Sequence, residues 1–229
     1  MLAVSAASMY ERGASRFRIG VVMSPEEGHG PAIWLSWNDR NLDLTTHHKL
    51  IGSQQFKINS DILEQFAASG VFARAFEIFE SSSRTQLEEA ITKGVYWFSD
   101  AHRDAAPVMR LIKYWSCIET FFSADNKDIT RSVSVGLASV LVYGGYNFVP
   151  ETEYLSFKKR VAKLYDVRSR AVHGAAYHHV SERNVDDLSQ WAAWLLISMI
   201  SFVERGYTKT GQIKAMADRL DQKLKGAGE

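Results

Sequence analysis

The chain of 229 residues contains a single cysteine, Cys117, and only four prolines. One cysteine excludes a disulfide within the chain and is typical of a reducing compartment. No apolar run reaches the roughly 18 residues that a membrane span needs, and the first residues lack the basic and apolar regions of a signal peptide. We therefore expect a cytoplasmic protein with no membrane partner, in which Cys117 is a core thiol and not a nucleophile.

The sequence also lacks the common signatures of cofactor binding and nucleophilic catalysis. No phosphate-binding glycine loop, paired-cysteine zinc signature or nucleophile elbow is present. His173, His178 and His179 lie close together, but Glu182 is the only acid near them and no carboxylate has ligand spacing. We expect no metal and no cofactor, and we interpret these residues as loop histidines exposed to solvent.

The pattern of the sequence changes near residue 59. Hydrophobic residues make up 46% of the chain and aromatic residues 12%, which is enough for a core. Before residue 59, alternating and apolar runs predict short strands at 16–23, 32–37 and 50–58, with a turn at 38–41. After it, apolar residues recur at helical spacing almost throughout. We therefore predict a mainly α protein, with a small β-rich N-terminal segment at 1–59 and an α-helical domain, a helical bundle, at 60–229.

Helix ends are marked by residues that cap or interrupt helices. Thr85 and Glu88 form a capping-box pattern, Asp128 is a candidate N-cap, and Asn184 with Asp187 predicts another helix start. The expected helices cover about 60–80, 85–98, 107–122, 128–143, 151–173, 184–205 and 209–224. Helices of these lengths, joined by short connections, are typical of a bundle with one shared core.

Arg168 lies at an unexpected place in the predicted helix at 151–173. The apolar stripe of this helix is formed by Phe157, Val161, Leu164 and Ala171/Val172. Arg168 takes one position in that stripe. An unpaired buried charge is very costly, so its guanidinium must be paired or must open onto a site or a partner. Glu119 lies between apolar neighbours on another helix, and we predict an ion pair between Glu119 and Arg168.

Charge is distributed unevenly, although the formal net charge is only +1. Residues 155–173 hold six basic residues and one acid, Asp166, whereas residues 60–90 are acidic. A basic face on an otherwise neutral protein suits a polyanion. It also suits a solvated helix face that is balanced by acids elsewhere in the fold, and charge alone leaves both interpretations open.

Arg168 and His173 stand five positions apart in a segment that Gly174 closes. Arginine grips phosphate with a rigid fork of donors, and histidine transfers protons near neutral pH. Together they suit metal-free cleavage of a phosphodiester, in which the RNA 2′-hydroxyl attacks the adjacent phosphorus. Five residues of an ideal helix, however, separate two side chains by roughly 140°. The pair converges only if the helix frays at Gly174 or if two copies of the chain meet; the alternative is a structural arginine with a histidine that caps the helix.

The run from Tyr165 to Gly174, YDVRSRAVHG, resembles the signature of HEPN domains (higher eukaryotes and prokaryotes nucleotide-binding), specifically the Apea-like branch. That signature is an arginine, four to six variable residues and a histidine. The branch often has an aromatic residue three positions before the arginine and a glycine after the histidine. Residues 111–122, 129–143 and 185–204 resemble the flanking core helices in the same order. The resemblance covers about 104–206 and leaves residues 1–59 outside.

The resemblance implies an antiparallel α-helical bundle that dimerises and brings two arginine–histidine motifs into one cleft. Many members are metal-independent endoribonucleases of toxin–antitoxin or antiphage defence systems, and they leave a 2′,3′-cyclic phosphate and a 5′-hydroxyl. Carried over to this chain, Arg168 orients the scissile phosphate and His173 is the general base or acid. Candidate RNA contacts beside them are Lys163, Tyr165, Ser169 and Arg170.

Glu119 is expected to support Arg168, and the expected partners are RNA, a second copy of the chain and an antitoxin or regulatory protein. Two other functions stay open. Some family members are inactive and bind nucleotides, RNA or proteins, and such a module would bind RNA without forming products. A structural bundle that mediates assembly would instead sequester Arg168 in an intrachain salt bridge, with no open cleft beside it.

Overall fold

The structure is a computed structural model that describes residues 32–37, 42–47, 64, 68, 70–104, 106–122, 128–173 and 179–226. The strands predicted at 16–23 and 50–58, the turn at 38–41 and the start of the first helix lie outside these residues. The predicted boundary at residue 59 therefore stays a prediction.

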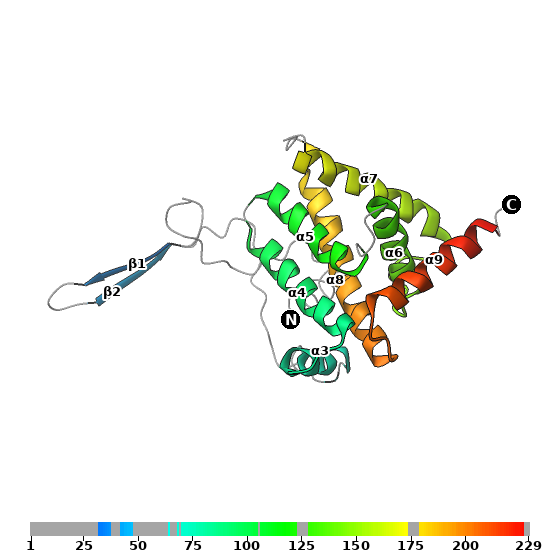
Figure 1. Ribbon diagram of the computed structural model, residues 1–229. Coiled ribbons are helices and arrows are strands. Elements are labelled where there is room, and N and C mark those ends of the chain that lie inside the picture. The colour runs from blue at the N-terminus through cyan, green and yellow to red at the C-terminus, as the bar shows by residue number, and fades with distance from the viewer. Residues whose placement is uncertain are drawn as a thin grey trace.

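The described residues after position 69 form an α-helical bundle, as the sequence predicts (Figure 1). A short 3₁₀ turn at Glu151–Glu153 leads into the fifth of its helices. The helices are α3 (Gly70–Glu80), α4 (Gln86–Arg103), α5 (Pro107–Phe122), α6 (Ile129–Tyr143), α7 (Tyr154–His173), α8 (Glu182–Glu204) and α9 (Thr210–Gly226). None of the helices in this part of the chain is both long and apolar enough to cross a membrane.

Helix α8 lies at the centre of the bundle and packs against α3, α4, α5 and α6 (Figure 1). Its sequence is apolar on almost every side, which predicts a helix surrounded by other helices. Leu188, Ala192, Leu195 and Met199 are fully buried. Helix α7 packs against α5 and α6, so the segment that carries Arg168 lies at one flank of the core.

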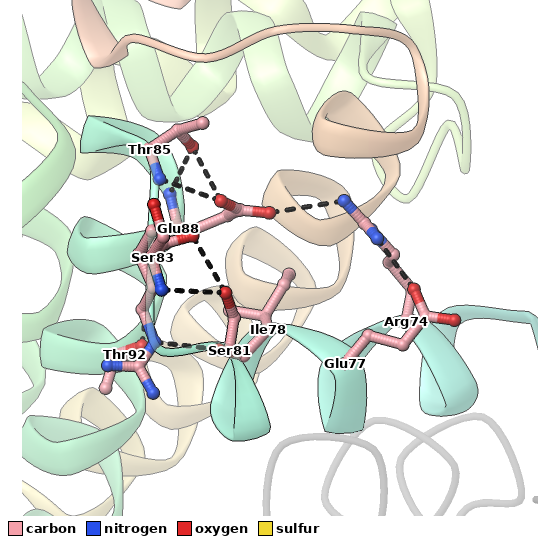
Figure 2. Close-up of polar contacts among 9 residues, drawn as sticks. Arg74, Glu77, Ile78, Ser81, Ser83, Thr85, Glu88 and Thr92 are labelled. Carbon is pink, nitrogen blue, oxygen red and sulfur yellow. Dashed lines mark hydrogen bonds and ion pairs between the residues drawn. The ribbon is translucent and has the colours of Figure 1, made fainter.

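The capping box predicted at Thr85 is present at the start of α4 (Figure 2). The backbone N–H of Thr85 donates to Glu88 Oε2 at 2.8 Å, and the N–H of Glu88 donates to Thr85 Oγ1 at 3.3 Å. Arg74 Nη2 of α3 donates to the other oxygen, Glu88 Oε1, at 3.2 Å. One carboxylate therefore caps α4 and also joins α3 to it.

Two predicted helix ends are wrong and one is confirmed. Helix α4 continues past Phe98 to Arg103, because its last turn still packs into the core through the fully buried Ala101. Helix α8 begins after Ser181 rather than at Asn184, because Ser181 Oγ accepts the backbone N–H of Asn184 at 3.2 Å and is the N-cap. The N-cap predicted at Asp128 is present: its Oδ1 accepts the N–H of Arg131 at 3.0 Å.

In the N-terminal segment the described residues form one antiparallel hairpin, β1 (Ala32–Trp37) and β2 (Leu42–His47). Ala32 pairs with His47 and Trp37 pairs with Leu42. The strand expected at 32–37 is therefore present. Strand β2 was not predicted, because LDLTTH is short and rich in polar residues.

Helices α5 and α6 meet at Gly136, where a side chain has no room. A Cβ added there would lie 2.4 Å from Cδ1 of the buried Phe122. We expect Gly136→Ala to destabilise the fold by about 1–3 kcal/mol, because overpacking forces the ring and the helices to shift. Gly211→Ala is the matched control: nothing lies within 4 Å of its added Cβ, and it should be neutral or stabilising by up to about 1 kcal/mol. Urea unfolding curves measure both, and equal midpoints for the two variants would contradict the close packing of α5 on α6.

Candidate functional site

Arg168 lies where the apolar stripe of α7 leaves the core. Val161, Leu164 and Ala171 are buried, as the stripe predicts. Val172 is 44% exposed, so its predicted place in the same buried stripe is wrong. The Arg168 side chain is 21% exposed, so its position is intermediate between core and surface. The end of α7 is therefore the place where a residue of the stripe can meet both the core and a ligand.

The ion pair predicted between Arg168 and Glu119 is confirmed. Arg168 Nη2 donates to Glu119 Oε2 at 3.2 Å, from α7 to α5. The second oxygen, Glu119 Oε1, accepts the hydroxyl of Tyr165 at 2.8 Å. The Glu119 side chain is only 17% exposed. Both of its oxygens therefore hold residues of α7, and this small network joins the two helices.

Tyr165 is the least exposed member of this network. Its ring packs edge-on against Trp115, with ring centroids 5.1 Å apart, and the residue is 7% exposed. Burial and the hydrogen bond to Glu119 raise the pKa of Tyr165 to about 12. The phenol therefore stays protonated near neutral pH and remains a donor to the carboxylate.

Among the described residues, the guanidinium of Arg168 is held on one side only. Nη2 contacts Glu119, and the group lies 5.5 Å from the centroid of the Tyr165 ring. Nη1 makes no hydrogen bond with the described part of the chain. Nε is buried and has no hydrogen-bond partner among the described residues. An arginine can bind a carboxylate through two nitrogens, so this contact through Nη2 leaves Nη1 as the donor that a phosphate oxygen could use.

The structure describes His173 by its helical backbone only, so it gives no distance between the His173 and Arg168 side chains. His173 is the last described residue of α7, and its side chain lies outside the described residues. So does His178, which belongs to the predicted histidine cluster. The helix is continuous from Arg168 to His173, and positions 168 and 173 lie roughly 140° apart around the axis of an ideal helix.

Half of the basic residues of α7 are paired with acids of neighbouring helices. Lys158 contacts the buried Asp221 of α9, and Arg160 Nη2 lies 3.1 Å from Asp187 Oδ2 of α8. Together with the Arg168–Glu119 pair, these contacts agree with the interpretation of a face balanced within the fold.

The remaining basic residues, Lys159, Lys163 and Arg170, are exposed. Lys163 and Arg170 lie roughly 140–160° around α7 from Arg168. The candidate RNA contacts Lys163 and Arg170 therefore face solvent on the other side of the helix from the Arg168 guanidinium. Ser169, the fourth candidate, is half-buried.

A cavity of about 340 Å³ lies between α6, α7 and α9, lined by Arg131, Lys158 and Asp221 among others. Lys158 precedes Arg168 by ten residues, or about 15 Å along the helix. This cavity is therefore separate from the network around Arg168, and its acids and bases balance each other.

Cys117 is fully buried and burial raises the pKa of its thiol, so the prediction of a core thiol is confirmed.

His102 is a residue that the sequence interpretation missed. Its Nδ1 lies 2.7 Å from the hydroxyl of Tyr114 and 3.2 Å from the carbonyl oxygen of Phe98. Burial, with a smaller contribution from Arg110, lowers its pKa to about 4. The position of His102 one turn after Phe98, on the apolar side of α4, is the only signal in the sequence for this site.

This part-buried histidine makes stability depend on pH. The unfolded chain takes up the proton at His102 near pH 6.5, whereas the folded chain takes it up only near pH 4. Folded protein thus binds fewer protons in this range, and stability is lost as the pH falls from 6.5 to 4. We expect His102→Gln to reduce that loss by on the order of 1–3 kcal/mol in urea titrations at several pH values. The same pH slope in both proteins would contradict the lowered pKa of His102 in the folded state.

Comparison of the chain with models of protein families, with curated proteins and with solved structures gave no match. The resemblance to HEPN domains therefore rests on the residues of the motif and on the order of the helices around it. What the described geometry adds is a specific arrangement: an arginine at the end of a buried stripe, held on one side by Glu119 and Tyr165.

Proposed function

We propose that this chain is a metal-independent endoribonuclease of the Apea-like HEPN type, with Arg168 and His173 as its catalytic pair. The observation that carries the proposal is the one-sided anchoring of Arg168. Glu119 fixes Nη2, while Nη1 stays without a hydrogen bond to the described residues at the partly exposed end of α7. A guanidinium in this state can receive a phosphate oxygen without breaking the ion pair that holds it.

The proposed reaction needs two proton transfers and one stabilised charge. A base removes the proton of the 2′-hydroxyl, its oxygen attacks the adjacent phosphorus, and the bond from phosphorus to the 5′-oxygen breaks. The leaving oxygen takes up a proton, which gives a 2′,3′-cyclic phosphate and a 5′-hydroxyl. His173 is assigned to proton transfer, and Arg168 to the charge that develops on the phosphate oxygens.

The assignment requires two copies of the chain. Positions 168 and 173 lie roughly 140° apart around one continuous helix, so in this proposal one copy alone does not direct both groups at one phosphate. A two-fold axis near the end of α7 would place the Arg168 of one copy beside the His173 of the other. The proposed partners are therefore RNA and a second copy, in the cytoplasm. An antitoxin or regulatory protein would restrain the activity in an antiphage or toxin–antitoxin system.

A non-catalytic role is the second candidate, and one observation favours it. Arg168 is already neutralised within its own chain by Glu119, as expected for an arginine that only ties two helices together. In this case the chain is a structural bundle, or a module that binds RNA or nucleotides without cutting them. Salt-sensitive, saturable RNA binding without cleavage products would identify the binding module.

The test of the catalytic pair is RNA cleavage in the presence of EDTA. We expect Arg168→Ala and His173→Ala each to lower the cleavage rate by on the order of 10²–10⁴-fold, because each removes a group that acts in the transition state. Arg160→Ala is the matched control: it removes another ion-paired arginine of α7, 3.1 Å from Asp187, and should leave the rate unchanged.

Circular dichroism of all three variants shows whether each is folded. Undiminished cleavage by both Arg168→Ala and His173→Ala would refute the catalytic assignment. Loss of cleavage in Arg160→Ala to the same extent would show that general loss of positive charge, and not the pair, is responsible.

A further inference from the structure

We propose that Tyr165 is a positioning residue for Arg168, and not an RNA contact as the sequence suggested. The inference rests on the proposed function, since it assigns a task within the same site. Tyr165 holds Glu119 in the orientation that engages one terminal nitrogen of Arg168 and leaves the other for a phosphate oxygen.

The first step concerns the carboxylate of Glu119. Its two oxygens have different partners, because Oε1 accepts the Tyr165 hydroxyl at 2.8 Å and Oε2 accepts Arg168 Nη2 at 3.2 Å. The shorter contact is the one to the neutral phenol. The hydroxyl is therefore one contact that sets the rotation of the carboxylate, and with it the nitrogen of Arg168 that Glu119 reaches.

The second step concerns the rigidity of Tyr165 itself. Its ring is packed edge-on against Trp115, which is fully buried in the core. Tyr165 and Arg168 are three positions apart on α7, so their side chains lie on the same face of the helix. A residue fixed in the core on the same helix face can thus set the geometry of the less buried Arg168. Because so little of the ring is exposed, a nucleotide base has no face of Tyr165 on which to stack.

The third step is what happens without the hydroxyl. Arg168 Nε is buried and has no hydrogen-bond partner among the described residues. A carboxylate that lacks the contact with Tyr165 can rotate toward Nε and Nη2 together, which is the bidentate geometry that arginine and carboxylate favour. That rotation would draw the guanidinium toward Glu119 and reorient Nη1. Loss of the hydroxyl thus leaves the ion pair intact but misplaces the donor that the phosphate needs.

The chain offers a closely matched control on the same helix. Tyr154 is also buried, and its hydroxyl donates to a carboxylate, Asp221 Oδ1, at 3.1 Å. Burial raises the pKa of Tyr154 to about 12, as it does that of Tyr165. Tyr154→Phe therefore removes the same kind of hydrogen bond from the same helix, away from Arg168.

The first readout is turnover. With a short RNA substrate we expect Tyr165→Phe to lower kcat on the order of ten-fold and to change KM by less than about two-fold, because orientation matters most in the transition state. Tyr154→Phe should leave both constants unchanged, while both variants lose a similar amount of thermal stability. Equal kcat values for Tyr165→Phe and Tyr154→Phe would overturn the proposal.

The second readout does not depend on cleavage. Arg168→Ala leaves a space beside Glu119 that free guanidinium ion at millimolar concentration can occupy, and occupancy raises the melting temperature of the folded protein. We expect this rise in Arg168→Ala and an equal rise in the double variant with Tyr154→Phe. The rise should be larger in the double variant with Tyr165→Phe, because its carboxylate can bind the ion through both oxygens. An equal rise in both double variants would overturn the positioning role. If the rise follows the expected pattern but the wild-type protein cuts no RNA, the positioning role stands and the proposed function fails.

Discussion

The contact of Arg168 with Glu119 is the interaction on which the rest of this site depends. A guanidinium in the apolar stripe of a helix is tolerated only if its charge is paired. Here one carboxylate from α5 provides the pairing, and a buried tyrosine of α7 holds that carboxylate in place. The contact is made with one terminal nitrogen only, so it satisfies the charge of Arg168 without using all of its donors. An arginine anchored in this way has a fixed position, and its Nη1 makes no hydrogen bond with the described residues. This arrangement suits recognition of a phosphate oxygen.

The bundle places this contact at its margin rather than in its centre. Helix α8 fills the centre, and its fully buried residues contribute no chemistry. Helix α7 lies on the flank against α5 and α6, and its buried stripe ends where Val172 becomes exposed. Arg168 lies one turn before that end, so its side chain is neither fully buried nor fully exposed to solvent. Trp115, Tyr165 and Glu119 are held by packing against the core, whereas Arg168 lies at the end of α7 and is partly exposed to solvent.

The periodicity of the sequence predicts most of the bundle, because apolar spacing and caps are local properties. Thr85 with Glu88 and Asp128 show this, since their side chains cap the backbone three residues away. The ion pair of Glu119 with Arg168 is also predictable, because an acid and a base on two apolar helices have few other ways to be compensated.

The role of Tyr165 is not predictable from the sequence, because it depends on which side of α5 faces α7 and on the edge-on packing with Trp115. The same holds for His102, whose low pKa arises from helices packed around it and not from its neighbours in sequence. Strand β2 is not predicted, because its sequence LDLTTH is short and rich in polar residues. The cap at Ser181 is not predicted, because Asn184 with Asp187 is the stronger local signal for a helix start.

The central claim is that Arg168 and His173 of one chain form half of a site that a second copy completes. Co-expression of the Arg168→Ala and His173→Ala chains tests it most directly, because a mixed dimer contains one intact Arg168 and one intact His173 on different chains. If the site is shared between copies, the mixed dimer cuts RNA although neither variant does so alone. A mixture that forms dimers and remains as inactive as the two separate variants, while the wild-type protein cuts RNA, would contradict the shared site.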